Sequence, residues 1–313
     1  MDRAKQTHYE VTNRTDGTTP PHGSGNSTSV AGRKCYLSPF RYPGGKSWFL
    51  PTVRQWLDAQ SPKPSVLIEP FAGGAAVALM AVSENLVEEA QFAEIDQDVA
   101  ATWHSILNGQ AGWLAKQIRE FKIGRRSVKA TLKKIPKSIH ERALQCLIRN
   151  RTAHGGVLQS GAGLLREGDG HGIASRWYPE TLAHRILAVS ALEHLHFCQR
   201  DGFHLIEQFA NRADVAFFVD PPYTSAASRL YHHWKIDHAQ LFVLLQRVAG
   251  SVLMTYDATA EIRKLAFEHG FQVRTIPMKT THHQKKRELM ISRDFSWLSR
   301  SAPPRGVPNN STR

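Results

Sequence analysis

The stretch Val215-Ala-Phe-Phe-Val219-Asp220-Pro221-Pro222-Tyr223 joins an unbroken apolar run to an acid, two prolines and an aromatic residue. Such a run, bounded by turn residues, predicts a buried strand of a parallel sheet. The strand must end at Asp220, because proline has no N–H to donate to a neighbouring strand. Ligands of open α/β sheets bind at the carboxyl ends of the strands, so we expect a functional site at Asp220.

Six further short apolar segments predict strands around this one. Helical patterns separate most of them, as at 237–249 and 258–269, where Asp237 is a suitable N-cap and Gly270 suits the position after a helix. The alternation predicts an α/β fold with a Rossmann-like, doubly wound, mostly parallel sheet. The last two segments lie so close together that we expect an antiparallel hairpin at one edge. The additional expected strands are 66–69, 91–95, 195–198, 251–256, 271–276 and 288–292.

The strand–helix alternation stops between about residues 110 and 192, where helical patterns and a glycine-rich run replace it. We therefore expect a catalytic domain formed by 38–109 and 193–298, with a mainly helical domain inserted at 110–192. The tails, 1–37 and 299–313, are rich in polar and turn-forming residues, and we expect both to be disordered.

Basic residues are concentrated in the insertion. The chain carries a formal net charge of +13, which favours an anionic partner such as nucleic acid. Between residues 116 and 151 there are twelve lysines and arginines but only two acids. A single lysine in such a run usually lies on a solvated helix face, but the concentration in one segment predicts contact with nucleic-acid phosphates. The residues singled out for this contact are Lys129, Lys133, Lys134, Arg149, Asn150 and Arg151.

The spacing of the cysteines and the hydropathy of the chain indicate the kind of cellular compartment in which we expect it. Cys35, Cys146 and Cys198 are odd in number and widely spaced, which favours a reducing, cytoplasmic setting without disulfides. We expect no signal peptide and no membrane contact, because no apolar run approaches the ~20 residues of a membrane span. The histidines and cysteines show no metal-binding spacing, so we expect no metal.

The residues after the 215–219 strand suit a flat ring with polar edges, such as a nucleobase. Asp220 can accept a hydrogen bond from an exocyclic amine, and the Pro221 carbonyl can accept a second. Pro222 makes the turn rigid, and Tyr223 can stack on the ring. The alternative is a proline-rich turn without a ligand, but four such residues directly after so clean a strand favour a catalytic site.

A second strand end predicts a cofactor site. The sequence Leu67-Ile-Glu-Pro-Phe-Ala-Gly-Gly-Ala-Ala76 is a strand, a glycine turn and the start of a helix at 75–83. It lacks the full G-x-G-x-x-G fingerprint, which points away from NAD. About twenty residues on, Glu94 stands where a carboxylate binds ribose in this architecture, unless it is only a solvated acid. Together these residues predict a cofactor that contains adenosine.

The sequence Arg41-Tyr-Pro-Gly-Gly-Lys46-Ser47 places a lysine after two glycines. The spacing of a phosphate loop is missing, because no first glycine precedes it. Lys46, held at the start of a helix, can instead pair with a carboxylate of the cofactor, although a surface lysine is the default interpretation of the residue alone.

These motifs resemble the Dam-like family of DNA adenine N6-methyltransferases, the alpha group with a DPPY motif. The likeness extends over most of 37–295 and includes Tyr42-Pro-Gly-Gly-Lys46, Glu69-Pro-Phe-Ala-Gly-Gly74, Glu94-Ile-Asp96, Asn150-Arg-Thr152 and Asp220-Pro-Pro-Tyr223. It continues with Asp237-His238, Leu253-Met-Thr-Tyr256 and Glu288-Leu-Met-Ile291, in the order of that group.

The resemblance implies S-adenosylmethionine as methyl donor, double-stranded DNA as partner and 110–192 as the target-recognition domain. It implies methyl transfer to N6 of a flipped-out adenine, with Asp220, Pro221, Pro222 and Tyr223 as the catalytic motif. The cofactor-binding residues that we predict are Tyr42, Lys46, Glu69, Phe71, Gly73, Glu94, Asp201 and Asp220. Asp201 enters by its family position, and its residue pattern alone equally fits a solvated loop acid.

The chain departs from the family pattern at three places. Ala75 stands where a third glycine is usual, Glu94 replaces an aspartate, and His154-Gly-Gly replaces a more aromatic stretch. For this reason no recognition sequence is carried over, and a restriction endonuclease counterpart is left open. The alternatives are an N4-cytosine methyltransferase and a non-catalytic DNA-binding protein on a methyltransferase scaffold. An NAD oxidoreductase is more distant, because the fingerprint glycines are missing.

Overall fold

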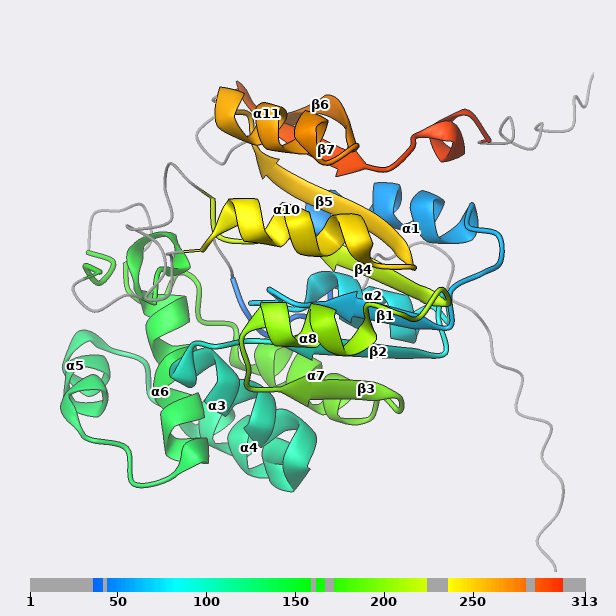
Figure 1. Ribbon diagram of the computed structural model, residues 1–313. Coiled ribbons are helices and arrows are strands. Elements are labelled where there is room, and N and C mark those ends of the chain that lie inside the picture. Colours follow the sequence, from blue (N-terminus) through cyan, green and yellow to red (C-terminus); the bar gives the residue numbers. More distant parts are fainter. Residues whose placement is uncertain are drawn as a thin grey trace, which may run out of the picture. The chain divides into compact units, whose positions relative to one another are not determined.

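Seven strands form a single sheet in the order β3-β2-β1-β4-β5-β7-β6 (Figure 1). The computed structural model describes residues 36–41, 44–158, 162–166, 172–223, 236–279 and 285–300, which all belong to one compact unit, Tyr36–Arg313. The strands are β1 Val66–Glu69, β2 Glu89–Ala93, β3 Leu195–Cys198, β4 Val215–Val219, β5 Ser251–Asp257, β6 Gln272–Lys279 and β7 Lys285–Ser292.

Helices connect these strands. The α-helices are α1 Leu50–Asp58, α2 Ala76–Ser83, α3 Gln97–Ser105, α4 Ala111–Glu120, α5 Arg125–Lys133, α6 Ile139–Thr152, α7 Pro179–Ser190, α8 Gly202–Phe209, α10 His238–Arg247 and α11 Ala260–Glu268. Shorter helical segments are η1 Lys46–Trp48, η2 Ile106–Gln110, η3 His154–Gly156 and η4 Ser296–Arg300.

The sheet is doubly wound, as the sequence predicts. Strands β3, β2, β1, β4 and β5 are parallel, whereas β7 is antiparallel to both β5 and β6. The expected hairpin is therefore confirmed, with β6 at the edge and β7 placed between it and β5. The chain first builds outward from β1 to β3 and then returns to place β4 beside β1. In doubly wound sheets ligands bind where the strand order reverses, which here is at the carboxyl ends of β1 and β4, directly at Glu69 and Asp220.

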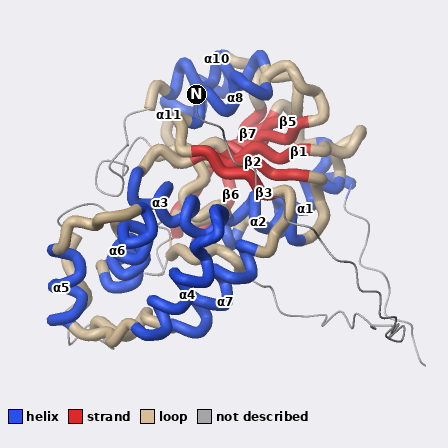
Figure 2. The backbone as a smooth tube through the Cα atoms, turned by 90° about the horizontal axis from the view of Figure 1, so that it is seen from below, coloured by secondary structure: helices blue, strands red, loops and turns tan. Residues whose placement is uncertain are grey.

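The two faces of the sheet bury separate apolar clusters. Along β4, Val215, Phe217 and Val219 face one cluster, whereas Ala216 and Phe218 face the other. Helices α8, α10 and α11 cover the first face, and α1, α2 and α3 cover the second (Figure 2). All five residues of β4 are buried, so the strand is apolar throughout because helices cover both of its sides.

The strand boundaries agree with the sequence where turn residues mark them. β1, β3 and β4 lie where they are expected, but β2 covers Glu89–Ala93 rather than 91–95. The chain leaves the sheet after Ala93 because Asp96 already caps α3, accepting hydrogen bonds from the amides of Asp98 and Val99. Strand β2 begins earlier than expected because Glu89 already pairs with Val66 of β1.

The two helix signals of the second half are confirmed. Asp237 caps α10 through the Gln240 amide at 2.9 Å, and Gly270 follows α11 with a positive φ of 73°.

The region from 110 to 192 is helical where the structure describes it. It contains α4 to α7 and η3, together with one isolated bridge between Ala153 and Leu164. Helix α6 packs against α3, and α7 packs against α4, so the region is anchored on the sheet-covering helices. Its role as a separate target-recognition domain stays a prediction. No helix in the described ranges is long and apolar enough to cross a membrane.

Gly250, which directly precedes β5, provides a test of the packing between β4 and β5. A Cβ at this position would collide with the Val215 carbonyl oxygen, which is backbone and cannot easily move. We expect Gly250→Ala to lower the free energy of unfolding by about 1–3 kcal/mol in urea denaturation. The matched control is Gly112→Ala in α4, where a Cβ meets nothing within 4 Å. It should be neutral or stabilise the protein by up to about 1 kcal/mol. Equal effects of the two changes would contradict this packing.

Candidate active site at the carboxyl ends of β1 and β4

A buried ion pair lies at the end of β4. The Lys46 Nζ atom is 2.9 Å from Asp220 Oδ2, and the two side chains are 4% and 20% exposed. Lys46 opens the short helix η1 and also donates to the Gly44 carbonyl at 2.9 Å. In this structure Lys46 pairs with an acid of the protein itself, Asp220. Its expected pairing with a cofactor carboxylate stays a prediction.

Two hydroxyl groups complete the surroundings of Asp220. Thr255 Oγ1, on β5, donates to Asp220 Oδ1 at 2.7 Å, and the Tyr223 hydroxyl donates to the same oxygen at 3.1 Å. The Tyr223 hydroxyl in turn accepts from Lys46 Nζ at 2.8 Å. Burial and the charges of Asp220 and Glu288 raise the pKa of Tyr223 well above its ordinary value, so it stays a donor. Three donors thus converge on the Asp220 carboxylate.

Glu288, on β7, adds a second carboxylate to this cluster. Its Oε2 atom is 3.7 Å from Lys46 Nζ and is buried without a hydrogen-bond partner. Burial raises the pKa of Glu288, and the nearby charge of Asp220 acts in the same direction. Sequence reasoning assigned no role to Thr255 or Glu288, because neighbours on β5 and β7 become visible only once the strand order is known. Their signal in the sequence was their place in Leu253-Met-Thr-Tyr256 and Glu288-Leu-Met-Ile291, two stretches that carry the family likeness.

Tyr223 does not lie open as a stacking platform in this structure. Its ring is stacked on Tyr256, with centroids 6.2 Å apart and planes inclined by 23°, and Lys46 Nζ lies 5.0 Å from its centroid. Pro221 and Pro222 hold the backbone between Asp220 and Tyr223. The acceptor predicted for a base amine is therefore satisfied internally by a hydroxyl and an ammonium group.

The glycine turn after β1 is tightly built. Gly73 has a positive φ of 48°, and the next residue but one, Ala75, also has a left-handed φ, of 47°. The left-handed conformation is natural for glycine but strained for alanine. Ala75, which departs from the family pattern, therefore keeps the backbone shape of the turn but strains the residue. Ser38 Oγ donates to the Gly74 carbonyl at 2.6 Å, and Trp103 Nε1 donates to the Gly73 carbonyl at 2.9 Å.

The N-terminus of α2 is already filled by a side chain. Glu69, 4% exposed, accepts a hydrogen bond from the Ala78 amide at 2.7 Å. In dinucleotide-binding proteins a pyrophosphate occupies this position at the first helix. The Glu69 side chain already occupies the amide that a phosphate oxygen would bind. The arrangement suits an adenosine cofactor without phosphates and agrees with the missing fingerprint glycines.

The other predicted cofactor residues lie at the same edge of the sheet. Glu94 directly follows β2, accepts from the Asp96 amide at 2.8 Å, and has its pKa raised to about 7, chiefly by burial. Phe71 directly follows β1 and packs edge-on against Phe203, with centroids 6.2 Å apart. Tyr42 lies outside the described residues.

Asp201 follows β3 and caps α8 by accepting from the Phe203 amide at 3.0 Å. The cap accounts for the residue without a ligand, so its assignment to the cofactor stays a prediction. Within the described ranges, no group of three histidines, cysteines or acids could hold a metal ion.

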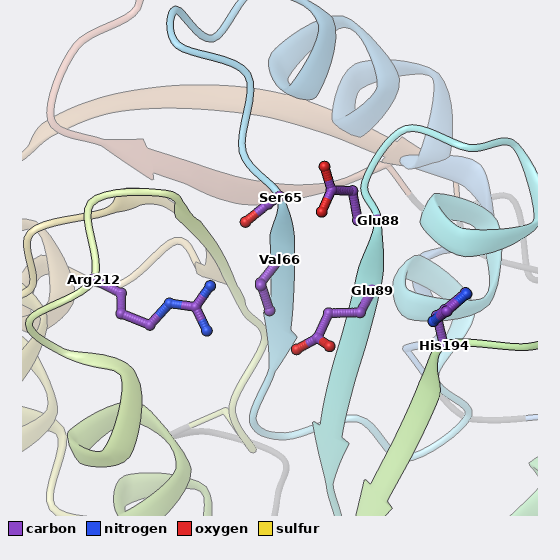
Figure 3. A pocket seen from close by; sticks show the side chains of 6 residues that line it. All are labelled: Ser65, Val66, Glu88, Glu89, His194 and Arg212. Carbon is purple, nitrogen blue, oxygen red and sulfur yellow. The ribbon is translucent and has the colours of Figure 1, made fainter.

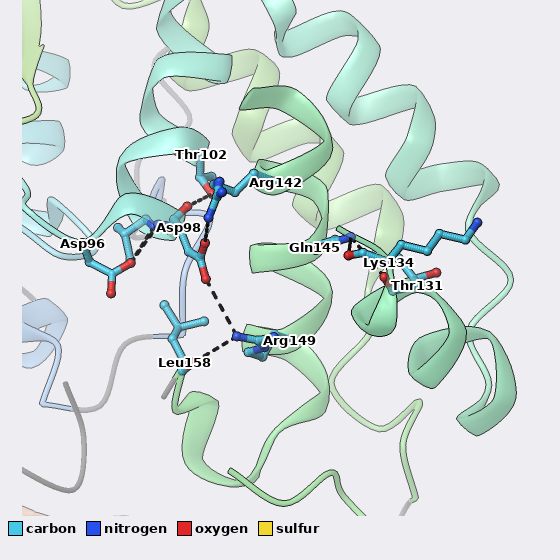
Figure 4. Close-up of polar contacts among 10 residues, drawn as sticks. Asp96, Asp98, Thr102, Thr131, Lys134, Arg142, Gln145, Arg149 and Leu158 are labelled. Atoms are coloured by element: carbon cyan, nitrogen blue, oxygen red, sulfur yellow. Dashed lines mark hydrogen bonds and ion pairs between the residues drawn. The ribbon is translucent and has the colours of Figure 1, made fainter. Parts of the chain in front are cut away.

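The predicted nucleic-acid residues divide into exposed and buried sets. Lys129, Lys133 and Lys134 are exposed on or beside α5, which Gln145 of α6 holds by donating to the carbonyls of Thr131 and Lys134 (Figure 4).

The arginines and the asparagine of α6 are held more firmly. Arg149 lies 3.8 Å from Asp98, which also pairs with Arg142 (Figure 4). Asn150 and Arg151 are buried. Asn150 bridges backbone groups, because it accepts from the Arg41 amide at 2.9 Å and donates to the Arg41 carbonyl at 3.0 Å and to the Gly156 carbonyl at 2.9 Å.

A pocket of about 510 Å³ lies at the other end of the strands, away from Asp220 (Figure 3). Its lining is Ser65, Val66, Glu88, Glu89, His194 and Arg212. These residues stand at the amino ends of β1, β2 and β3 or beside them, away from the switch point. The pocket is therefore separate from the site at Asp220.

Comparison with known proteins adds a likeness of fold. No family model matches the chain, and no curated protein matches it. Among solved structures, it is similar to magnesium protoporphyrin IX methyltransferase of Synechocystis PCC 6803 with bound SAM, at 11% identity and a TM-score of 0.36, with 79% of each chain covered. It is also similar to a tRNA methyltransferase of B. subtilis, at 11% identity and a TM-score of 0.33, with 80% of this chain and 67% of that chain covered. TM-scores of this size carry no inference about activity, which rests on the residues of this chain.

Glu69 makes the stability of the fold depend on pH. Burial raises its pKa from the ordinary value of 4.5 to about 8. The protonated form is therefore favoured in the folded protein, and its contribution to stability is lost as the pH rises from about 4.5 to about 8. The Glu69→Gln variant stays neutral over this range. We expect its free energy of unfolding, relative to that of the unchanged protein, to increase by on the order of 2 kcal/mol between pH 5 and pH 8.5.

Denaturant unfolding of both proteins at the two pH values measures this difference. The control is Glu84→Gln, a partly exposed acid paired with Arg54, where the neutral variant should show no such gain. If the difference in free energy of unfolding between Glu69→Gln and the unchanged protein does not change with pH, the raised pKa of Glu69 is not the cause.

Proposed function

We propose that this protein transfers a methyl group from S-adenosylmethionine to the exocyclic amine of a nucleobase, and that the base is a flipped-out adenine in double-stranded DNA, methylated at N6. The observation that carries the proposal is the convergence of three donors on Asp220 at the switch point of the sheet. A carboxylate that binds an ammonium and two hydroxyls is placed to accept N–H groups from an amine. Pro221 supplies a further carbonyl acceptor next to it.

The lone pair of an aromatic amine is delocalised into the ring and is a poor nucleophile. Two acceptors on its N–H groups favour a more tetrahedral nitrogen whose lone pair can attack a methyl group. The residues act by positioning and by placing negative charge near the nitrogen as it becomes positive. The amine takes the place that the Tyr223 hydroxyl and Lys46 fill in this structure, while Thr255 keeps its hydrogen bond to Asp220. Once displaced, the Tyr223 ring is free to stack on the base.

The residues at this edge of the sheet fit the cofactor. The turn at Gly73 lets the backbone approach a ligand closely, Glu94 is placed for ribose hydroxyls, and Glu69 excludes a pyrophosphate. S-adenosylmethionine, when bound, supplies an activated methyl group on a sulfonium. The acids Asp220 and Glu288 outnumber the single ammonium of Lys46 at this edge, which favours a cationic donor.

The basic residues of the insertion support a nucleic-acid substrate. Exposed lysines on α5 can neutralise phosphates and release counterions. A base inside a duplex cannot reach a buried carboxylate, so it must be flipped out, and phosphate contacts offset the unstacking cost of a few kcal/mol. The same acceptors fit the amine of cytosine, and an RNA base presents the same group. Methylation assays on each substrate therefore form part of the test.

Asp220→Ala tests the acceptor directly. We expect methyl transfer from radiolabelled S-adenosylmethionine to DNA to fall by at least about 10³-fold, because positioning and charge stabilisation are both lost. DNA binding, measured by fluorescence anisotropy, should stay within about 3-fold. The matched control is Asp58→Ala, an acid at the end of α1 that is 59% exposed, and it should leave turnover unchanged.

Digestion of the product to nucleosides then identifies the modified base. N6-methyladenine supports the proposal, and N4-methylcytosine supports the alternative that the sequence left open. Retained turnover in Asp220→Ala would rule out the role given to this residue. Failure of the unchanged protein to bind S-adenosylmethionine in calorimetry would favour a non-catalytic DNA-binding protein.

Lys133→Gln combined with Lys134→Gln tests the basic helix. Both side chains are exposed, so we expect weaker binding to all DNA sequences alike and a slope of log Kd against log salt reduced by up to about 2. Anisotropy titrations at several salt concentrations with two unrelated duplexes measure this. The control Lys63→Gln, in the loop after α1, should leave the slope unchanged. A change in sequence preference would mean that these lysines contact bases instead.

A further inference from the structure

Four arginines from separate segments lie close to one another beside the N-terminal part of the fold. Arg41 precedes the loop to Lys46, Arg151 lies at the end of α6, Arg176 precedes α7, and Arg185 lies within α7. Their charges act on one another: Arg176 disfavours the charged form of Arg41, and Arg185 and Arg41 disfavour that of Arg151. Among the described residues, none of the four forms an ion pair with an aspartate or glutamate, whereas Arg142 and Arg149 share Asp98.

The backbone of 38–41 holds this cluster in place. Arg185 donates to the Ser38 carbonyl at 3.2 Å, and Arg151 donates to the Pro39 carbonyl. Asn150 fixes both backbone groups of Arg41. Gly156, with a positive φ of 80°, packs so closely on the Arg41 carbonyl that a Cβ could not fit. The head groups of Arg151 and Arg185 and the backbone of Arg41 are therefore held by backbone contacts rather than by attraction to acids.

Two guanidinium nitrogens of the cluster are buried and have no partner. Arg151 is 6% exposed, and its Nε atom makes no hydrogen bond. Arg176 Nη1 is buried without a partner in the same way. Burial, followed by the charges of Arg185 and Arg41, lowers the pKa of Arg151 to about 10. An unsatisfied buried donor on a charged group is unfavourable, and so is an uncompensated group of like charges.

We propose that Arg41, Arg151, Arg176 and Arg185 form an oxyanion site, and that its ligand is a backbone phosphate of the nucleic-acid substrate close to the target nucleotide. Planar guanidinium groups match the oxygens of a phosphate and can bind it in pairs. A bound phosphate would satisfy the unpartnered donors and balance the four charges together. The choice of a nucleic-acid phosphate rests on the proposed function, whereas the oxyanion site itself does not.

The position of Arg41 favours a phosphate of the substrate. Lys46 is five residues after Arg41, so their Cα atoms lie at most about 18 Å apart. Lys46 contacts Asp220, where the target base is proposed to bind. A strand whose base enters this site brings its neighbouring phosphates within that distance. The carboxylate of the cofactor is the competing anion, because Ser38 also contacts the glycine turn.

The test uses Arg41→Gln and Arg176→Gln, because Arg41 is exposed and Arg176 is only partly buried, whereas Arg151 is buried and Arg185 holds the Ser38 carbonyl. The matched control is Arg119→Gln in α4, which removes the same charge from an arginine paired with Glu180 at 2.9 Å. Thermal unfolding is measured with inorganic phosphate and with chloride at equal ionic strength. Phosphate should raise the melting temperature of the unchanged protein and of Arg119→Gln, and each cluster variant should lose that shift.

Anisotropy titrations with labelled duplex then identify the ligand. Each cluster variant should reduce the slope of log Kd against log salt by about 0.9, as expected for one lost phosphate contact, and Arg119→Gln should not. Binding of S-adenosylhomocysteine in calorimetry should be unchanged. A normal salt slope together with weakened S-adenosylhomocysteine binding would overturn the assignment and give the site to the cofactor carboxylate.

Two further outcomes separate this inference from the proposed function. A phosphate-dependent shift that is lost in the variants, in a protein that binds no nucleic acid, would support the oxyanion site and overturn its nucleic-acid ligand. The absence of any phosphate-dependent shift, together with a normal salt slope in both variants, would overturn the site itself, even if methyl transfer is found.

Discussion

The ion pair between Lys46 and Asp220 is the contact on which the arrangement of the site depends. It joins the loop before α1 to the end of β4, and both groups are largely removed from water. Removing one partner of a buried pair leaves the other uncompensated, which costs about 3–5 kcal/mol. The lysine therefore holds the Asp220 carboxylate in place at the end of β4. An incoming amine must compete with the Lys46 ammonium for Asp220, so binding of substrate and movement of Lys46 and Tyr223 are linked.

Opposite charges dominate the two functional regions. The site at the strand ends contains Asp220 and Glu288 around one ammonium, so it disfavours a further anion. The insertion is the reverse, with exposed lysines on α5 and with Arg151, Arg176 and Arg185, which form no ion pair with an acid among the described residues. Arg41, before the insertion, adds a fourth such arginine. In the proposed function a polyanionic strand is attracted to this basic surface and excluded from the strand ends, apart from a neutral base. The charge pattern alone separates where the backbone can bind from where the base can bind.

Much of this could be predicted from the sequence, because local signals determined it. The apolar run and the two prolines located β4, and the glycines located the turn after β1. What could not be predicted depends on neighbours distant in sequence. Thr255 and Glu288 reach Asp220 only because β5 and β7 follow β4 in the sheet, and Asn150 contributes to packing instead of lying exposed. Tyr223 was expected as an open stacking surface, but its hydroxyl finds the nearest acceptor and donor and turns inward.

The segment that begins at Ser38 contacts three parts of the proposed site. Ser38 contacts the Gly74 carbonyl of the cofactor turn, Arg41 is fixed by Asn150 and Gly156 of the insertion, and Lys46 contacts Asp220. One short piece of chain therefore touches the proposed donor site, the proposed phosphate site and the acceptor of the base. Because Asn150 and Gly156 hold the Arg41 backbone, the arginine cluster stays close in sequence and in space to the residue that pairs with Asp220. A strand bound at the proposed phosphate site is therefore already near the acceptor of the base.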